Sequence, residues 1–300
     1  MLKALSLLCL LYSVGAQADS SWQKESSRYL EQLLKNNPAQ LQELKESAVL
    51  NFYRQRKYKL LWSNDKGRLD RAYDLLQVII KAKDEGLDPA DYYFEEFNKY
   101  WDSTGLGESV QLDLLLSAAL YRYSNDVHSG RLIASDLDPD WHIKNEPLNA
   151  GRLFADVGRK ASIAQLLKEL PPQNDGYQSL KQQLHNFREL AQQGGWQRLG
   201  WGPVLERGMQ HEQVVPLRRR LKLTGDMAVD PFPDMDMYDR WLEEAVMHYQ
   251  QRHGLEVDGK VGPQTRRSLN VMVSDRIRQI RINMERWRWL PRKLGKRYVM

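Results

Sequence analysis

The sequence from Tyr238 to Val271 reads YDRWLEEAVMHYQQRHGLEVDGKVGPQTRRSLNV, and it decides the fold of the C-terminal part of the chain. Apolar residues recur in its first half at the spacing of one helix face, which predicts an amphipathic helix that His253-Gly254 closes. The residues of that face are Trp241, Leu242, Ala245, Val246 and Tyr249.

One further helix is predicted before this one and one after it, so the segment 205–272 should form a three-helix bundle. Pro263 follows the tight turn of Asp258-Gly259 and suits the first turn of a helix, because that position needs no N–H donor. Thr224-Gly225 ends the upstream helix. The face of that upstream helix is formed by Val214, Leu217 and Leu221.

Nine positions of the segment match the peptidoglycan-binding type 1 family at the right spacing. They are Tyr249, Gln250, Gly254, Leu255, Asp258, Gly259, Gly262, Thr265 and Leu269. The family has Phe where this chain has Tyr249. The segment therefore resembles a peptidoglycan-binding module, which implies peptidoglycan as a partner, through its stem peptides or its glycan strands. The alternative is that the module is only a spacer.

The resemblance also suggests which residues contact the ligand. Stem peptides carry carboxylates, which arginine pairs with bidentately. Arg252, His253, Arg266 and Arg267 flank the turn and the helix starts and are the candidates, although each could be a solvated surface charge. His248 and His253 are five residues apart and lack the i, i+4 spacing of a zinc helix, so we expect no metal and no cofactor.

The last stretch, Asn283 to Met300, reads NMERWRWLPRKLGKRYVM. A helix capped by Ser274 should lead into it and stop at Pro291, and Tyr298-Val299 has strand character. The stretch resembles the segment before the catalytic β-domain of the YcbB-like L,D-transpeptidases. The matching residues are Asn283, Glu285, Arg286, Arg288, Trp289, Leu290, Pro291, Gly295, Arg297 and Tyr298. Gly86-Leu87-Asp88-Pro89 with Tyr92, Tyr121 to Gly130, and Leu170-Pro171 with Tyr177 resemble the scaffold of the same family.

This resemblance implies covalent catalysis by a cysteine, assisted by a histidine, on the amide between the third and fourth residues of a stem peptide. The only cysteine is Cys9, so no catalytic residue of the family can be placed on residues 19–300. We expect residues 274–300 to be a linker helix and the start of a truncated catalytic domain, and the chain as given to bind the wall without crosslinking it. The alternatives are a fragment of a longer, active transpeptidase and a non-catalytic periplasmic adaptor for other cell-wall synthesis enzymes.

Residues 1–18 have the features of a cleavable signal peptide. Lys3 supplies a positive charge, Leu5 to Val14 form an apolar run, and Ala16-Gln17-Ala18 is a small-x-small cleavage site. The run is shorter than the roughly 20 residues that a membrane-spanning helix needs. We therefore expect export to the periplasm and a mature chain that begins at Asp19, the alternative being an uncleaved anchor.

Residues 19–195 are predicted to form a helical scaffold domain. The strongest helical stripe consists of Ala72, Leu75, Leu76, Ile79, Ile80 and Ala82, and Gly86 ends it. Gln111 to Tyr123 is apolar almost all round, which predicts a buried helix. No clear strand is predicted before the last few residues. The fold class is therefore mainly α, with only the first strand of a β-rich domain at the end.

The charge of the chain favours an anionic partner. The net charge is +5, and removal of Lys3 with the signal peptide leaves +4. In an exported protein the anionic candidates are the cell wall and the membrane surface. The Arg-rich stretch 276–297 contains Trp287 and Trp289, which could stack on bases, but behind a signal peptide no nucleic acid is expected.

Overall fold

The computed structural model describes residues 21–36, 47–143, 147–159 and 162–292. The chain divides into two compact units, residues 1–181 with 282–300 and residues 182–281. The expected signal peptide 1–18 and the expected strand at Tyr298-Val299 lie outside the described residues. Within the described ranges, no helix is both long enough and apolar enough to cross a bilayer.

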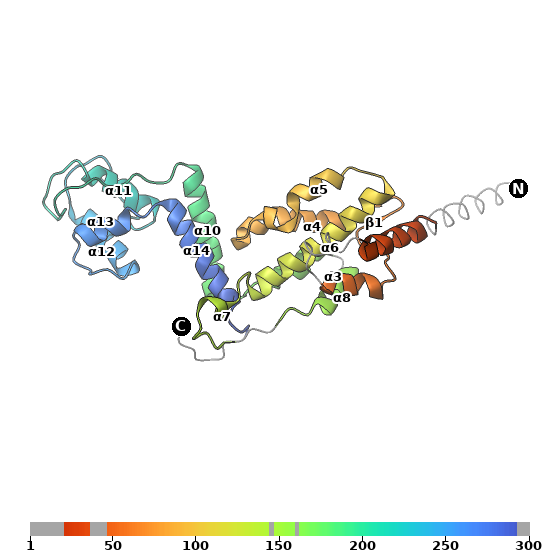
Figure 1. Cartoon of the computed structure of the whole chain (residues 1–300). Coiled ribbons are helices and arrows are strands. Elements are labelled where there is room, and N and C mark those ends of the chain that lie inside the picture. The colour runs from red at the N-terminus through yellow and green to blue at the C-terminus, as the bar shows by residue number, and fades with distance from the viewer. Residues whose placement is uncertain (1–20, 37–46, 144–146, 160–161, 293–300) are drawn as a thin grey trace, which may run out of the picture. The chain divides into compact units, whose positions relative to one another are not determined.

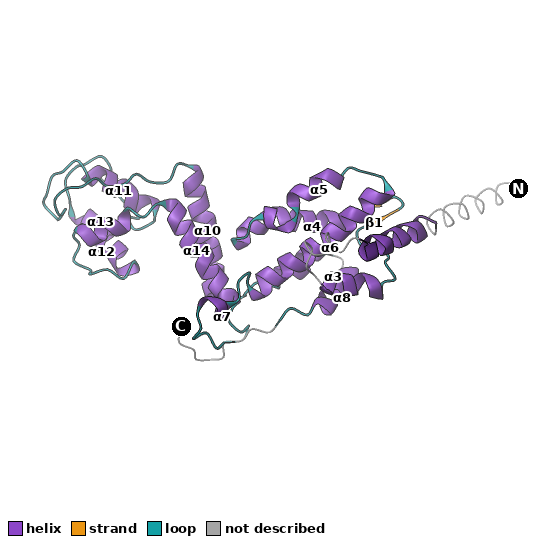
Figure 2. Ribbon diagram, in the orientation of Figure 1, coloured by secondary structure: helices purple, strands orange, loops and turns teal. Residues whose placement is uncertain are grey.

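The described residues of the first unit are almost entirely helical (Figures 1 and 2). Residues 21–36 form an unlabelled helix. The remaining elements are α3 (Ser47–Gln55), β1 (Ser63–Asn64), β2 (Gly67–Arg68), α4 (Asp70–Ile80), η1 (Lys81–Glu85), η2 (Pro89–Tyr92), α5 (Phe94–Tyr100), α6 (Leu106–Ser129), α7 (Ala134–Leu137), α8 (Ala150–Arg159), α9 (Ile163–Lys168), the start of α10 (Asp175–Gln192) and the end of α14 (Val273–Arg288).

The long helix α6 is the centre of the first unit. Its side chains are buried nearly all round, and α3, α4 and α5 pack against it. The expectation of a buried helix over 111–123 is therefore confirmed, and the helix is longer than the apolar run. The stripe over 72–82 forms α4 and the 3-10 turn η1. Gly86 ends that turn with a φ of 74°, a conformation that glycine adopts without strain.

A buried carboxylate on α6 holds the residues that lead into the small hairpin. Asp113 Oδ1 accepts hydrogen bonds from the Tyr53 hydroxyl at 2.6 Å and the Leu61 N–H at 2.9 Å, and Oδ2 accepts from the Trp62 N–H at 2.7 Å. Burial raises the pKa of Asp113 to about 6, although the donors act in the opposite direction. The hairpin pairs β1 with β2 antiparallel, and sequence periodicity missed it because each strand has only two residues.

The charged side chains of Arg288 and Glu285 fix the end of α14 within the first unit. Arg288 is 2% exposed and donates to the carbonyl of Glu85 and, at 2.9 Å, to the Tyr177 hydroxyl. Glu285 Oε1 accepts from the backbone N–H groups of Arg131 and Leu132. Two residues of the Asn283–Met300 motif thus serve as anchors between distant parts of the chain.

The second unit is built around α11 (Val214–Leu223), α12 (Arg240–Arg252) and α13 (Pro263–Leu269), with the end of α10 and the start of α14 (Figure 1). The mainly α fold with a helical scaffold and a three-helix bundle is confirmed. The apolar core of the bundle consists of Leu199, Leu205, Val214, Leu217, Leu221, Met227, Tyr238, Leu242, Ala245, Val246, Tyr249, Val261 and Leu269.

Two local expectations for this unit were wrong. Trp241 was assigned to the buried face of its helix but is 36% exposed, and the Arg240 guanidinium lies 4.6 Å from the centre of its ring. Ser274 was expected to cap the last helix, but α14 begins one residue earlier, at Val273. Both differences arise at helix ends, where the apolar pattern constrains the geometry least.

Candidate functional site

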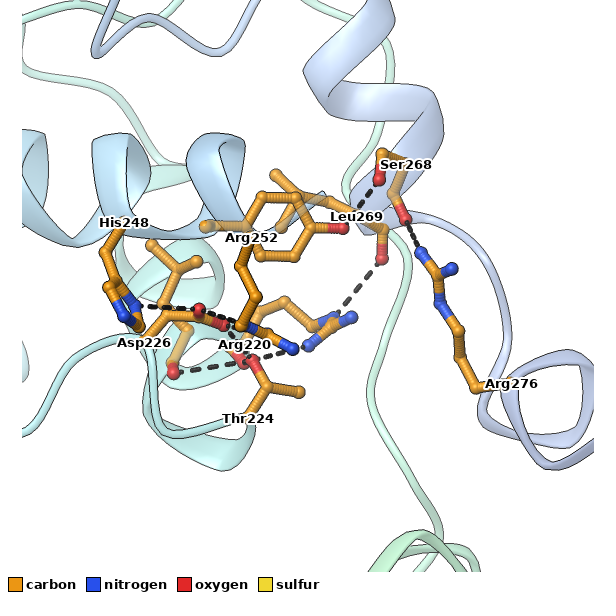
Figure 3. Close-up of polar contacts among 10 residues, drawn as sticks. Arg220, Thr224, Asp226, His248, Arg252, Ser268, Leu269 and Arg276 are labelled. Atoms are coloured by element: carbon orange, nitrogen blue, oxygen red, sulfur yellow. Dashed lines mark hydrogen bonds and ion pairs between the residues drawn. The ribbon is translucent and has the colours of Figure 1, made fainter. Parts of the chain in front are cut away.

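Four basic side chains and one carboxylate of the second unit interact electrostatically, and we call the four side chains the basic cluster. Figure 3 shows three of them, Arg220, Arg252 and Arg276. Arg220 belongs to α11, Arg252 and His253 lie at the end of α12, and Arg276 lies in the first turn of α14. The carboxylate is that of Asp226, in the loop after α11.

The Asp226 side chain is fully buried and makes four hydrogen bonds to three residues. Arg252 donates to both carboxylate oxygens, from Nε at 3.0 Å and from Nη2 at 2.8 Å. Thr224 Oγ1 donates to Oδ2 at 2.6 Å, and His248 Nδ1 lies 3.1 Å from Oδ1. Asp226 therefore offsets the charge of Arg252 in the bidentate geometry that guanidinium and carboxylate groups prefer.

Arg220 is buried, and none of its hydrogen bonds within the described residues goes to a carboxylate. Its Nε donates to the carbonyl of Leu269 at 3.2 Å and its Nη1 to Thr224 Oγ1 at 3.1 Å (Figure 3). Arg220 Cζ lies 3.7 Å from the centre of the Trp196 ring, a cation–π contact. Burial lowers the pKa of Arg220 to about 10, so the side chain is still charged at neutral pH.

Arg276 adds a further positive charge at the half-buried edge of the cluster. Its Nη2 donates to the carbonyl of Ser268 at 3.1 Å and its Nη1 to the amide oxygen of Gln279 at 3.0 Å, and both acceptors are neutral. The basic cluster thus contains three guanidinium groups and the single carboxylate of Asp226. The basic cluster has an excess of two positive charges at neutral pH, which favours the binding of an anion.

The pKa of His253 responds to burial and to the positive charges of the neighbouring arginines. Its ring lies 4.1 Å from that of Tyr249. Burial, followed by the charges of Arg276 and Arg252, lowers the pKa of His253 from 6.5 to about 4. The imidazole is therefore neutral at neutral pH and supplies no charge to the cluster there.

We expect an NMR titration of the free protein to place the His253 pKa near 4. Because this value lies below the unfolded value, the contribution of His253 to stability is fully present above pH 6.5 and is lost as the pH falls towards 4. The variant His253→Gln should lack this part of the pH dependence. A His253 pKa near 6.5 would contradict the close approach of the arginines.

A groove of about 560 Å³ lies elsewhere on the same unit, between residues 198–204 and α13. Arg267 is exposed at this groove, whereas Arg266 is only 6% exposed. The Arg266 guanidinium donates to the carbonyls of Gly200 and Pro203, at 2.7 and 2.8 Å, and to the amide oxygen of Gln213. Arg266 therefore shapes the wall of the groove and has few donors left for a ligand.

The four residues predicted from the sequence thus lie in two places. Arg252 and His253 belong to the basic cluster, and Arg266 and Arg267 line the groove. Sequence reasoning missed Arg220, although its spacing from Leu217 places it beside the apolar face of α11. It also missed Arg276, whose approach to α12 depends on tertiary structure. Within the described residues, no group of three His, Cys, Asp or Glu side chains is placed to hold a metal ion.

Two separate parts of the chain match known protein families. Residues 47–184 match the family described as a Scaffold domain, and residues 210–269 match the family described as a Putative peptidoglycan binding domain. No match was found among curated proteins. The chain therefore combines a helical scaffold domain with a peptidoglycan-binding domain, which supports peptidoglycan as its partner and a role in cell-wall binding.

Proposed function

We propose that the protein binds peptidoglycan in the periplasm and that its basic cluster receives a carboxylate of a stem peptide. The observation that carries this proposal is the excess of guanidinium groups over carboxylates in the basic cluster, which lies largely in a segment that matches a peptidoglycan-binding family. Stem peptides offer several carboxylates, and planar carboxylates suit the fork geometry of arginine.

The members of the cluster take different parts in this proposal. Arg252 and Arg276 are partly exposed and supply the direct contacts. Arg220 is buried and acts through its charge, which two neutral acceptors leave uncompensated. Asp226 holds Arg252 in place, so that less side-chain entropy is lost when the ligand binds.

Co-sedimentation of residues 19–300 with purified wall sacculi tests this function. We expect the protein to pellet with intact sacculi and to be released as the salt concentration rises from about 0.05 to about 0.5 M, because salt screens exposed charges. Sacculi from which an amidase has removed the stem peptides should retain markedly less protein. Retention no greater than that of an unrelated protein of similar charge would overturn the proposal.

We further propose that the protein belongs to the L,D-transpeptidase family and takes part in peptidoglycan crosslinking. The order of scaffold domain, peptidoglycan-binding domain and the motif around Glu285 and Arg288 supports this assignment. Residues 19–300 carry no cysteine, so we propose that they bind the wall without catalysing thiolate-dependent acyl transfer. Crosslinked products formed from tetrapeptide donors by purified residues 19–300 would contradict this inactivity.

A further inference from the structure

The Trp201 side chain is 97% exposed at the groove between residues 198–204 and α13. Val204, in the same loop, is 45% exposed. Burial of a tryptophan side chain contributes favourable free energy to folding. The exposed indole of Trp201 does not make this contribution. An indole displayed in this way beside a groove of about 560 Å³ has the character of a ligand contact.

Side chains of Gln213 and Arg266 donate hydrogen bonds to the main chain of the loop that carries Trp201. Gln213 Nε2 donates to the carbonyl of Trp201 at 2.8 Å, and Arg266 donates to the carbonyls of Gly200 and Pro203. Gln213 approaches so closely that a Cβ on Gly202 would lie 3.1 Å from its Nε2. The main chain on both sides of the indole is therefore fixed while the indole itself projects into solvent.

A second anchor fixes the start of the same loop. The side-chain amide of Asn270 accepts from the Leu199 N–H at 2.8 Å and donates to the Leu199 carbonyl at 2.9 Å. Because the backbone is already ordered, little conformational entropy of the loop is lost when a ligand stacks on Trp201. This geometry is that of a preorganised aromatic platform.

The groove offers two kinds of contact to a ligand. Trp201, Pro203 and Val204 supply apolar surface, and Arg198 and Arg267 supply hydrogen-bond donors at its rim. A pyranose ring matches this combination, because one of its faces presents C–H groups and its edge carries hydroxyl groups. The C–H groups suit the electron-rich face of an indole.

We infer that Trp201 and its groove form a subsite for a pyranose ring of a peptidoglycan glycan strand, separate from the basic cluster. This inference rests on the proposed wall-binding function and assigns the glycan and the stem peptide to different surfaces of one module. Arg266 takes part only by positioning the loop that carries Trp201.

The test measures the affinity of residues 19–300 for two separate probes, amidase-released glycan strands without peptides and a free stem tetrapeptide. We expect Trp201→Ala to weaken binding of the glycan strands at least about tenfold and to leave binding of the tetrapeptide unchanged. Trp201→Tyr, which keeps an aromatic face, should retain part of the glycan affinity. Trp241→Ala removes another partly exposed indole of the same unit and should alter neither affinity.

The two proposals fail in different ways. If the wild-type protein binds glycan strands and Trp201→Ala binds them equally well, the subsite is overturned while wall binding stands. If the wild-type protein binds neither probe, the proposed function itself is overturned. Circular dichroism and the thermal midpoint of each variant show whether the fold is intact.

Discussion

Replacement of Asp113 by alanine is expected to destabilise the first unit strongly, because this carboxylate is a fully buried acceptor on α6. The substitution leaves the buried N–H groups of Leu61 and Trp62 without acceptors and opens a cavity beside Tyr53. Each unsatisfied buried donor costs about 1–3 kcal/mol, so we expect a loss of at least about 3 kcal/mol. Calorimetry should show the thermal midpoint of this unit falling by roughly 6–12 °C.

The same variant should change the dependence of stability on pH. The pKa of Asp113 is raised to about 6 in the folded state, above its unfolded value. The folded state therefore binds the proton more tightly, and the stability that this provides is lost as the pH rises through about 6. Asp113→Ala should lack this loss.

Glu108 provides a matched control on the same helix. It is exposed in the first turn of α6, where an acidic side chain contributes at most about 1 kcal/mol. Glu108→Ala should therefore shift the midpoint by only a few degrees. Equal shifts for Asp113→Ala and Glu108→Ala would contradict the role assigned to the buried carboxylate.

The second large effect is expected from reversal of charge in the basic cluster. Arg276→Glu replaces a cation by an anion near Arg220 and His253 and should weaken retention on intact sacculi at least about tenfold, equivalent to about 1.4 kcal/mol. It should also reduce the dependence of retention on salt, because fewer charges contact the ligand.

Arg278→Glu is the control for this variant. Arg278 lies two residues further along α14, and its side chain is 76% exposed. Its replacement by glutamate changes the net charge by the same amount as Arg276→Glu. We expect its retention on sacculi to remain within about twofold of the wild type, because exposed charges away from the site act only through the screened net field. If both variants lose binding equally, net charge and not the basic cluster determines retention.

Helix positions in both units followed from apolar spacing because packing of one face dominates helical stability. The stripe on α4, the buried run on α6 and the start of α13 at Pro263 are examples. The spacing did not reveal Asp113 as a buried acceptor, because its backbone donors at Leu61 and Trp62 are more than fifty residues away. Such contacts depend on tertiary structure, which periodicity does not encode.

The candidate site was predicted only in part for a similar reason. The family motif pointed to residues near the turn, and Arg252 and His253 do lie in the basic cluster. Arg266 resembled them in sequence, but its burial and its carbonyl partners show that it shapes the groove. Charge alone does not distinguish an arginine that faces a ligand from one that holds a loop.

The central claim is that the basic cluster recognises a carboxylate of a wall stem peptide. Calorimetry on residues 19–300 tests it most directly by comparing a stem tetrapeptide with the same peptide in which every carboxylate is converted to an amide. The account predicts that the carboxylate form binds at least about tenfold more tightly, and that Arg276→Glu removes this difference. Equal affinity for the two peptides, or no binding of either, would contradict it.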